Sequence, residues 1–226
     1  MNATYRQPFF NKIKNMDGGS MSEFMPIMID LENLPCLVVG GGKVARRKVI
    51  QLIRFKARVT VSDTKLEPGL QKFHSKGLIV WKRKRFSLFD FWGQKLIIAA
   101  TDDPQTNRKV CRLAAGFGLL CNAVDDAQVS GFIFPAIHKQ GSLVLSVSTQ
   151  GLSPSLARKI KRELVLRYGA VYQDFVLKLG RIRKRLYRME PDFKKRKRIL
   201  NRLTNLGPDE LLKMEEDKVE EWIRDG

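Results

Sequence analysis

Short apolar runs and segments with helical spacing alternate through the first 125 residues of the chain. The first run, Leu37–Val39, leads through three glycines into a segment whose apolar residues recur at helical spacing up to Ile53. Four further apolar runs follow at 57–62, 78–81, 96–100 and 119–124, and helical segments lie at 67–76 and 104–117. Continuous apolar runs rich in β-branched residues are typical of strands buried on both faces. Strands that alternate with helices predict an α/β fold with a doubly wound parallel sheet.

A glycine-rich turn joins the first strand to the first helix. Gly40, Gly42 and Ala45 match the pattern G-x-G-x-x-G/A in this strand–turn–helix context. The first glycine makes the turn, the second lets a diphosphate approach the backbone, and the small third residue lets the helix pack on the strand. Asp63 ends the second strand, where a Rossmann fold holds a ribose, although it is equally placed to cap the next segment. The sequence therefore predicts a Rossmann-type parallel sheet that binds a nucleotide at the N-terminus of a helix.

Polar residues follow the later strands of this predicted sheet. Thr101-Asp102-Asp103 follows one strand, with Asp103 placed to cap the next helix, while Asn122 and Asp125-Asp126 belong to the last strand and its end. Parallel strands present their carboxyl ends at one edge, and ligands of such sheets bind there. We therefore expect these side chains to lie beside the glycine turn.

The pattern changes at Val129. Two apolar runs, 132–137 and 143–148, surround His138–Gly141 and predict a hairpin, which cannot be stable alone and is expected to pack on a second subunit. From Ser153 onward, apolar residues recur every four positions, which predicts helices interrupted near Gly169 and Gly180, with a last acidic helix at 209–225. The expected organisation is a poorly ordered extension at 1–24, a nucleotide-binding domain at 25–128, a strand-rich dimerisation segment at 129–152 and a helical C-terminal domain at 153–226.

Composition adds a strong positive charge. The net charge is +19 over 226 residues, which suits a polyanion, an anionic membrane surface or a highly carboxylated ligand. No apolar run approaches the 18 or so residues of a membrane span. Cys36, Cys111 and Cys121 share no metal-ligand spacing, so we expect small buried thiols in a reducing cytoplasm and no metal site. His74 and His138 are expected at the surface.

Several motifs in order carry a resemblance to a known family. They are Met25–Ile27, Val39–Lys48, Ala99–Asp103 with Asn107, Cys121–Asp125, Phe132–Ala136 and Ser146–Arg158. With these motifs, residues 25–169 resemble the precorrin-2 dehydrogenase/sirohydrochlorin ferrochelatase family, whose module also forms the N-terminal part of siroheme synthase. The resemblance implies a cytoplasmic homodimer that oxidises precorrin-2 to sirohydrochlorin with NAD⁺. Many members then insert Fe²⁺ to give siroheme.

The resemblance also implies roles for individual residues. The catalytic aspartate falls on Asp125, with Asp126 as the adjacent competitor. The residues expected to bind the cofactor are Gly40, Gly42, Lys43, Val44, Asp63, Thr64, Lys65, Thr101 and Asn122. Lys65 beside Asp63 leaves the choice between NAD⁺ and NADP⁺ open, because a nearby cation can accept a 2′-phosphate. Candidates for binding the carboxylates of the tetrapyrrole are Arg158, Lys161 and Arg162.

Some features depart from the family, and other interpretations stay open. Thr149 occupies the position at which some relatives carry a serine that is phosphorylated. No methyltransferase domain follows, so we do not expect this chain to make precorrin-2 itself. One alternative is a dehydrogenase that hands its product to a separate chelatase, and another is a non-catalytic nucleotide or tetrapyrrole sensor. A remote alternative is a nucleic-acid-binding protein that uses the basic stretch Arg181–Arg198.

Overall fold

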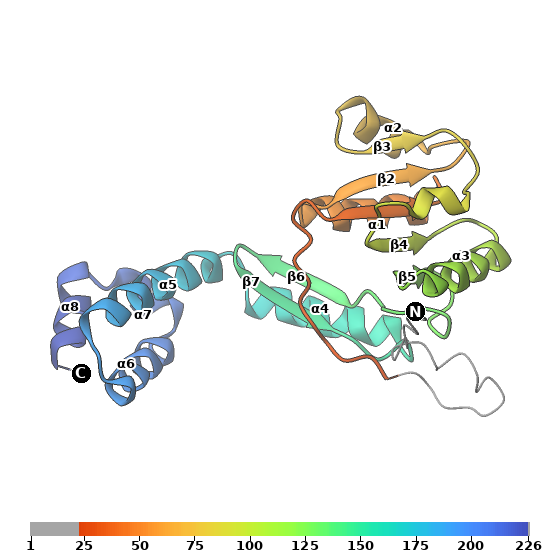
Figure 1. The fold of residues 1–226 in the computed structure, drawn as a ribbon. Helices are drawn as coiled ribbons and strands as arrows, with labels where there is room; N and C mark the ends of the chain where they lie inside the picture. The colour runs from red at the N-terminus through yellow and green to blue at the C-terminus, as the bar shows by residue number, and fades with distance from the viewer. Residues whose placement is uncertain (1–22, 226) are drawn as a thin grey trace, which may run out of the picture. The chain divides into compact units, whose positions relative to one another are not determined.

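The computed structural model describes residues 23–225, which form two compact units (Figure 1). The first unit ends at Phe134 and the second begins at Pro135. The boundary therefore lies after the position expected from the sequence, residue 128, because Phe132 and Phe134 pack against the core of the first unit. Most of the predicted N-terminal extension, at residues 1–22, lies outside the described residues.

The first unit is built on a parallel five-stranded sheet in the order β3-β2-β1-β4-β5. The strands are β1 (Pro35–Val39), β2 (Arg58–Ser62), β3 (Val80–Lys82), β4 (Leu96–Ala99) and β5 (Leu120–Ala123). The order reverses at β1, which lies between β2 and β4. The carboxyl ends of all these strands meet at one edge, and the predicted Rossmann-type sheet is confirmed.

Helices cover both faces of the sheet, as Figure 1 shows. On one face, α1 (Lys43–Arg54) and α2 (Pro68–Ser75) pack against Cys36 and Val38 of β1. On the other, α3 (Pro104–Gly116) and the short 3₁₀ helix η2 (Leu88–Phe91) pack against Leu37 and Val39. β1 is thus buried on both faces, which explains its uninterrupted apolar sequence.

The cysteines differ from the expectation. Cys111 of α3 and Cys121 of β5 form a disulfide, so the expectation of free thiols was wrong for this pair. The two residues are ten positions apart in the chain and are brought together because α3 packs directly on β5. Cys36 is free and buried, and burial raises the pKa of its thiol to about 11.

The second unit begins with an antiparallel hairpin of β6 (Ala136–Gln140) and β7 (Leu143–Val147), and α4 (Pro154–Arg167) packs along both strands. The hairpin was predicted, but its first strand lies further along the chain than expected. His138 is in β6 and not in the turn, and its Nε2 lies 2.9 Å from the carbonyl oxygen of Tyr168. The turn contains only Gly141, with φ of 57°, and Ser142, which is typical of a two-residue hairpin loop.

The remaining helices form a bundle with its own apolar core. They are α5 (Val171–Met189), α6 (Phe193–Asn205), α7 (Gly207–Lys213) and α8 (Glu216–Asp225). Gly180 lies inside α5, so the predicted interruption there was wrong. The predicted acidic helix at 209–225 is divided between α7 and α8, and Arg185 forms ion pairs with Glu216 and Glu220 of α8. Within residues 23–225, no helix combines the length and apolar character needed to cross a bilayer.

Candidate functional site

The glycine turn after β1 is shaped by close backbone contacts. Gly40 has φ of 118°, and a Cβ there would overlap the carbonyl of Ala100. A Cβ on Gly41 would overlap the carbonyl of Lys65. Both positions therefore require glycine for the fold alone, whether or not a ligand binds.

Gly42 differs from these two glycines. A Cβ added there would meet only Oδ1 of Asp102, at 3.8 Å, so the protein itself leaves open space beside this residue. Gly42 is also the N-cap of α1, and no side chain caps that helix. The first turn carries no acidic residue and begins with exposed Lys43, followed by Val44. Its uncapped backbone N–H groups, the helix dipole and the open space beside Gly42 fit the diphosphate of a dinucleotide.

Asp63 joins the end of β2 to the glycine turn. Its Oδ2 accepts a hydrogen bond from the Gly41 N–H at 2.6 Å. Its Oδ1 accepts from the Lys65 N–H at 3.2 Å and from Thr64 Oγ1 at 3.3 Å. An ionised carboxylate has about four acceptor sites, so these three bonds leave room for a ribose hydroxyl. Asp63 therefore caps the following turn, and these local bonds are compatible with the predicted contact to a nucleotide.

A second cluster lies at the ends of β4 and β5. Asn107 of α3 is completely buried, and its Nδ2 donates to the carbonyl of Thr101 at 3.1 Å and to Oδ1 of Asp125 at 3.2 Å. Its Oδ1 accepts from the N–H of Thr101 at 3.0 Å and from the Thr101 hydroxyl at 2.8 Å. The structure thus brings Thr101 and Asp125 together, as expected, through a residue to which the sequence analysis assigned no role.

The neighbouring carboxylate, Asp126, accepts hydrogen bonds through both of its oxygens. Its Oδ2 accepts from Nε of Arg108 at 2.8 Å, and its Oδ1 accepts from the N–H of Gln128 at 2.9 Å. The Asp126 side chain is 14% exposed, whereas Asp125 belongs to the exposed residues. Two consecutive residues of α3 therefore hold two consecutive aspartates, and the carboxylate of Asp125 is the more accessible of the two.

Asn122 supplies an unpaired acceptor at the same edge. The residue is 5% exposed, and its Nδ2 donates to the carbonyl of Phe132 at 3.0 Å. Its Oδ1 is buried and has no hydrogen-bond partner within the part of the chain that the structure describes. A buried acceptor without a partner is costly, and the amide group of a nicotinamide is a donor that would satisfy it.

Lys48 is a residue of α1 that the sequence analysis named only as part of a motif. Its Nζ lies 4.0 Å from the ring centroid of Phe134. Burial, together with the positive charge of Arg47, lowers the pKa of Lys48 to about 8. The only sequence signal for Lys48 was its place in the motif Val39–Lys48. Its contact with the ring of Phe134 could not be predicted, because Phe134 lies far from it in the chain.

The expected substrate-binding residues form a separate set in the second unit. Arg158, Lys161 and Arg162 lie three and four positions apart on α4, which places them on one side of the helix. Arg158 donates from Nε to the carbonyl of Pro154 at 3.2 Å, within the first turn of the helix. Arg158 and Arg162 are exposed, and Lys161 is half-buried.

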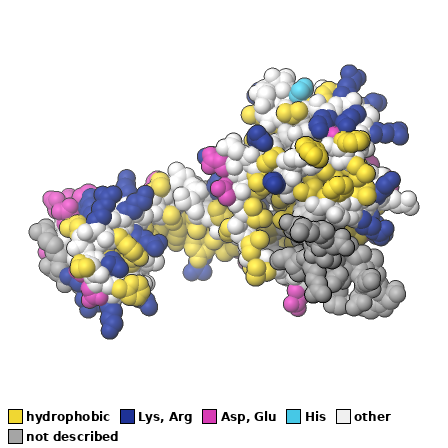
Figure 2. Space-filling view, in the orientation of Figure 1, with side chains coloured by type: hydrophobic (Ala, Val, Ile, Leu, Met, Phe, Trp, Pro, Cys, Tyr) yellow, Lys and Arg dark blue, Asp and Glu magenta, His cyan; other side chains and the backbone are white. Residues whose placement is uncertain are grey.

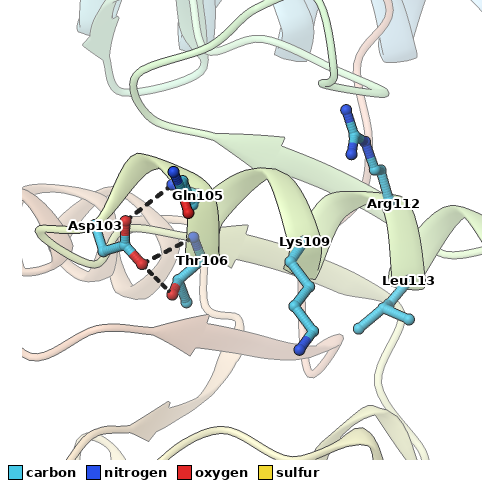
Figure 3. Close-up of a pocket in the computed structure, with 6 residues that line it drawn as sticks. All are labelled: Asp103, Gln105, Thr106, Lys109, Arg112 and Leu113. Atoms are coloured by element: carbon cyan, nitrogen blue, oxygen red, sulfur yellow. Dashed lines mark hydrogen bonds between the residues drawn. The ribbon is translucent and has the colours of Figure 1, made fainter.

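A shallow groove of about 510 Å³ lies along α3, and Figure 3 shows the residues that line it. It is lined by Asp103, Gln105, Thr106, Lys109, Arg112 and Leu113. Asp103 accepts from the Thr106 hydroxyl at 2.5 Å and from the backbone N–H groups of Gln105 and Thr106, and these bonds hold the pKa of Asp103 below its usual value. Of the polar residues expected beside the glycine turn, Asp103 lines this groove, whereas the residues expected to bind the cofactor or the substrate do not.

Comparison with known proteins supports a nucleotide site in this unit. Residues 27–136 match the family model described as putative NAD(P)-binding. The siroheme synthase of Methylococcus capsulatus is 41% identical over 142 residues, which cover 63% of this chain and 30% of that protein. Siroheme synthase 2 of Aeromonas hydrophila is 32% identical over 206 residues, which cover 90% of this chain and 43% of that protein. The chain thus spans less than half the length of these relatives.

A solved structure extends the similarity into the second unit. The protein described as SirC, precorrin-2 dehydrogenase, matches with a TM-score of 0.70 and 25% sequence identity. The match covers 89% of this chain and 98% of that one. It therefore includes the parallel sheet and much of the region that follows it. Within the described residues, no group of three or more His, Cys, Asp or Glu side chains is arranged to hold a metal ion.

Proposed function

We propose that this chain, which belongs to the precorrin-2 dehydrogenase/sirohydrochlorin ferrochelatase family, oxidises precorrin-2 to sirohydrochlorin with NAD⁺. One observation carries the proposal. The glycine turn and the accessible carboxylate of Asp125 both lie at the carboxyl edge of the sheet, where doubly wound folds bind their ligands. The relatives' names supply the substrate, and the site supplies groups suited to the reaction.

The cofactor-binding residues have distinct roles in this proposal. The N–H groups at Gly42, Lys43 and Val44 bind the diphosphate, and Asp63 accepts a hydrogen bond from a ribose hydroxyl. Oδ1 of Asn122 accepts a hydrogen bond from the nicotinamide amide. When bound, the nicotinamide ring supplies the hydride acceptor that the oxidation requires.

Asp125 is proposed as the group that accepts a proton. Conversion of precorrin-2 to sirohydrochlorin removes two hydrogens: a hydride leaves to NAD⁺, giving NADH, and a proton leaves to a base. The exposed carboxylate of Asp125 is available to take that proton, whereas Asp126 is already paired with Arg108. The proton then passes to solvent, so the carboxylate is regenerated.

The positive charge of the chain suits the substrate. The tetrapyrrole carries eight carboxylate side arms, and a protein with a net charge of +19 attracts such an anion. Arg158, Lys161 and Arg162 are the proposed contacts on α4, because guanidinium and ammonium groups form charge-assisted hydrogen bonds with carboxylates. Lys and Arg side chains also cover much of the visible surface of the C-terminal helices (Figure 2).

Insertion of Fe²⁺ into sirohydrochlorin is a second candidate activity. It is favoured by the similarity to proteins named siroheme synthase. In this reaction Fe²⁺ is a substrate, and two pyrrole N–H protons leave as it enters. The carboxylate of Asp125 is suited to accept them in turn. If this activity is lacking, a separate chelatase would use the product.

We further propose that the hairpin of β6 and β7 forms a dimer interface. None of the ten strand residues is buried in the single chain, although Ile137, Leu143 and Leu145 are apolar. A two-stranded hairpin with this much accessible apolar surface gains stability by packing on a partner. Sedimentation at micromolar concentration should show a dimer, and a monomer would contradict this proposal.

The reaction uses NAD⁺, so we propose that the protein acts in the cytoplasm. The disulfide between Cys111 and Cys121 argues against a reducing compartment such as the cytoplasm, because disulfides are rare there. The redox state of this pair in the purified protein therefore bears directly on the proposed compartment.

An anaerobic assay tests the proposed function. Purified protein is mixed with precorrin-2 and NAD⁺, and the appearance of sirohydrochlorin and NADH is followed by absorbance. Fe²⁺ or Co²⁺ is then added to the same cuvette. Oxidation followed by metal insertion faster than in a protein-free control supports both activities, and oxidation alone supports a dehydrogenase. Absence of oxidation would contradict the proposal and direct attention to the basic helices α5 and α6.

A further inference from the structure

Asn107 is the most completely bonded side chain at the carboxyl edge of the sheet. It is fully buried, and its amide forms two hydrogen bonds through oxygen and two through nitrogen. Exchange of oxygen and nitrogen would place the NH₂ group against the N–H donor of Thr101, and the oxygen against the Thr101 carbonyl and the Asp125 carboxylate. The network therefore fixes the orientation of the amide.

This network joins three elements of the fold. Thr101 follows β4, Asn107 lies in the first turns of α3, and Asp125 follows β5. Thr101 uses its N–H, its carbonyl and its hydroxyl to hold the amide. The direction of the Asn107 NH₂ group toward Asp125 is thus set by the backbone at the end of β4, and not by the loop that carries Asp125.

The contact holds only one oxygen of Asp125. Oδ1 accepts from Asn107, and within the described residues no hydrogen bond reaches Oδ2. A carboxylate held at one oxygen by a rigid neutral donor has a defined orientation and keeps its second oxygen for another partner.

We propose that Asn107 is a positioning residue for the oxidation, which orients Asp125 and presents its Oδ2 to the substrate. This inference rests on the proposed function, because it takes Asp125 as the group that accepts the proton. Asn107 itself does not touch the substrate and acts only through Asp125.

The neighbouring residue provides a matched control. Arg108 is the next residue of α3 and holds Asp126, the next residue of the loop, through a contact of 2.8 Å. Both contacts attach the loop after β5 to α3, but only that of Asn107 reaches the proposed base. A general loosening of this loop would therefore appear in both Asn107 and Arg108 variants.

The test compares Asn107→Asp, Asn107→Ser and Arg108→Gln in the precorrin-2 assay. Asn107→Asp keeps the size of the side chain and the acceptor for the N–H and hydroxyl of Thr101. It removes the donor to Asp125 and also the donor to the Thr101 carbonyl. We expect kcat to fall by about tenfold or more in both Asn107 variants, since misplacing a catalytic group by about 1 Å costs up to 10²-fold. The KM for NAD⁺ should change by less than about threefold, and Arg108→Gln should keep kcat within about threefold of wild type. Asn107→Ser serves if Asn107→Asp fails to fold, which NAD⁺ binding and thermal unfolding will show.

A double-mutant cycle separates positioning from structural damage. In an Asp125→Ala background, Asn107→Asp should reduce the residual single-turnover rate no further, because its effect passes through the missing carboxylate. An equal loss in both backgrounds, or an equal loss of kcat in Arg108→Gln, would overturn the inference. If Asp125→Ala leaves no measurable rate, the inference is judged by comparing kcat of the Asn107 variants with kcat of Arg108→Gln.

The outcomes also separate this inference from the proposed function. If wild-type protein does not oxidise precorrin-2, the proposed function fails and the inference fails with it. If wild type is active, Asp125→Ala is not, and the Asn107 variants keep full kcat, the proposed function stands and only the positioning role is overturned.

Discussion

The N–H of Gly41 donates a hydrogen bond of 2.6 Å to Oδ2 of Asp63, which lies 22 residues later in the chain. This contact links the glycine turn after β1 to the end of β2. A single carboxylate thus shapes the turn that would bind the diphosphate and remains available to a ribose hydroxyl. The two parts of the nucleotide fingerprint are therefore physically coupled, and a change at Asp63 should affect both.

Replacement of Asp63 tests this coupling. Asp63→Ala should weaken NAD⁺ binding by about tenfold or more, because a charge-assisted hydrogen bond contributes roughly 1.5–3 kcal/mol. It should also reduce any preference for NAD⁺ over NADP⁺, because the carboxylate repels a 2′-phosphate whereas Lys65 attracts it. Asp63→Asn, which keeps an acceptor for Gly41, should retain more thermal stability than Asp63→Ala. Calorimetric titration with both nucleotides measures the effect, and unchanged affinities would exclude Asp63 from the site.

Gly41 and Gly42 should respond differently to substitution. Gly42→Asp should fold, since a Cβ at this position meets only Asp102 at 3.8 Å, but it should abolish NAD⁺ binding through bulk and negative charge. Gly41→Ala should instead lower the thermal stability, since its Cβ would overlap the Lys65 carbonyl. Thermal unfolding and NAD⁺ titration of both variants distinguish these effects. Normal cofactor affinity in Gly42→Asp would remove the argument from the glycine fingerprint.

The two adjacent aspartates should be separable by mutation. Asp125→Ala should lower the rate of oxidation by about 10²-fold or more, as expected for loss of a general base, with NAD⁺ affinity nearly unchanged. Asp126→Asn should lose the ion pair with Arg108 yet keep most of the activity. Steady-state kinetics with precorrin-2 and separate NAD⁺ titrations provide the measurement. The reverse pattern would assign the proton acceptor to Asp126.

Lys48 should make folding stability depend on pH. Its pKa is about 8 in the folded chain, compared with an ordinary value of 10.5. Between these values the unfolded chain binds the proton and the folded chain does not, so this contribution to stability rises with pH. Relative to Lys48→Met, wild type should therefore gain about 1–3 kcal/mol from pH 7 to pH 10. Urea unfolding of both proteins at each pH tests this, and a constant difference would contradict it.

The state of the cysteines can be counted directly. With the disulfide formed, the denatured protein should show one reactive thiol, that of Cys36, and three after reduction. Replacement of Cys111 and Cys121 by Ser should cost about 2–3 kcal/mol of stability under oxidising conditions, as expected for a loop of this length. Unfolding in the presence of a reductant should remove most of this difference. Three thiols without reduction would show that the pair is not bonded in the isolated protein.

Several elements of both units could be predicted from short stretches of the sequence. The apolar run of β1 required burial on both faces, and Gly40–Gly42 required a tight turn into α1. Asp103 and Ser153 were followed by Pro104 and Pro154, and both residues cap helices that begin at those prolines. These signals operate within a few residues, so a linear sequence contains them in full.

The remaining features depended on contacts between distant segments. Asp125, Asp126 and Cys121 each have a side-chain partner on α3, and only the packing of α3 against β5 brings these side chains together. The hairpin begins later than its apolar pattern indicated, because Phe132 packs against the core of the first unit. Hydrophobicity alone does not say which surface will bury a side chain. The sequence by itself determined the sheet and its nucleotide-binding turn, whereas tertiary packing decided which carboxylate stays accessible, because hydrogen-bond partners are chosen by distance in space.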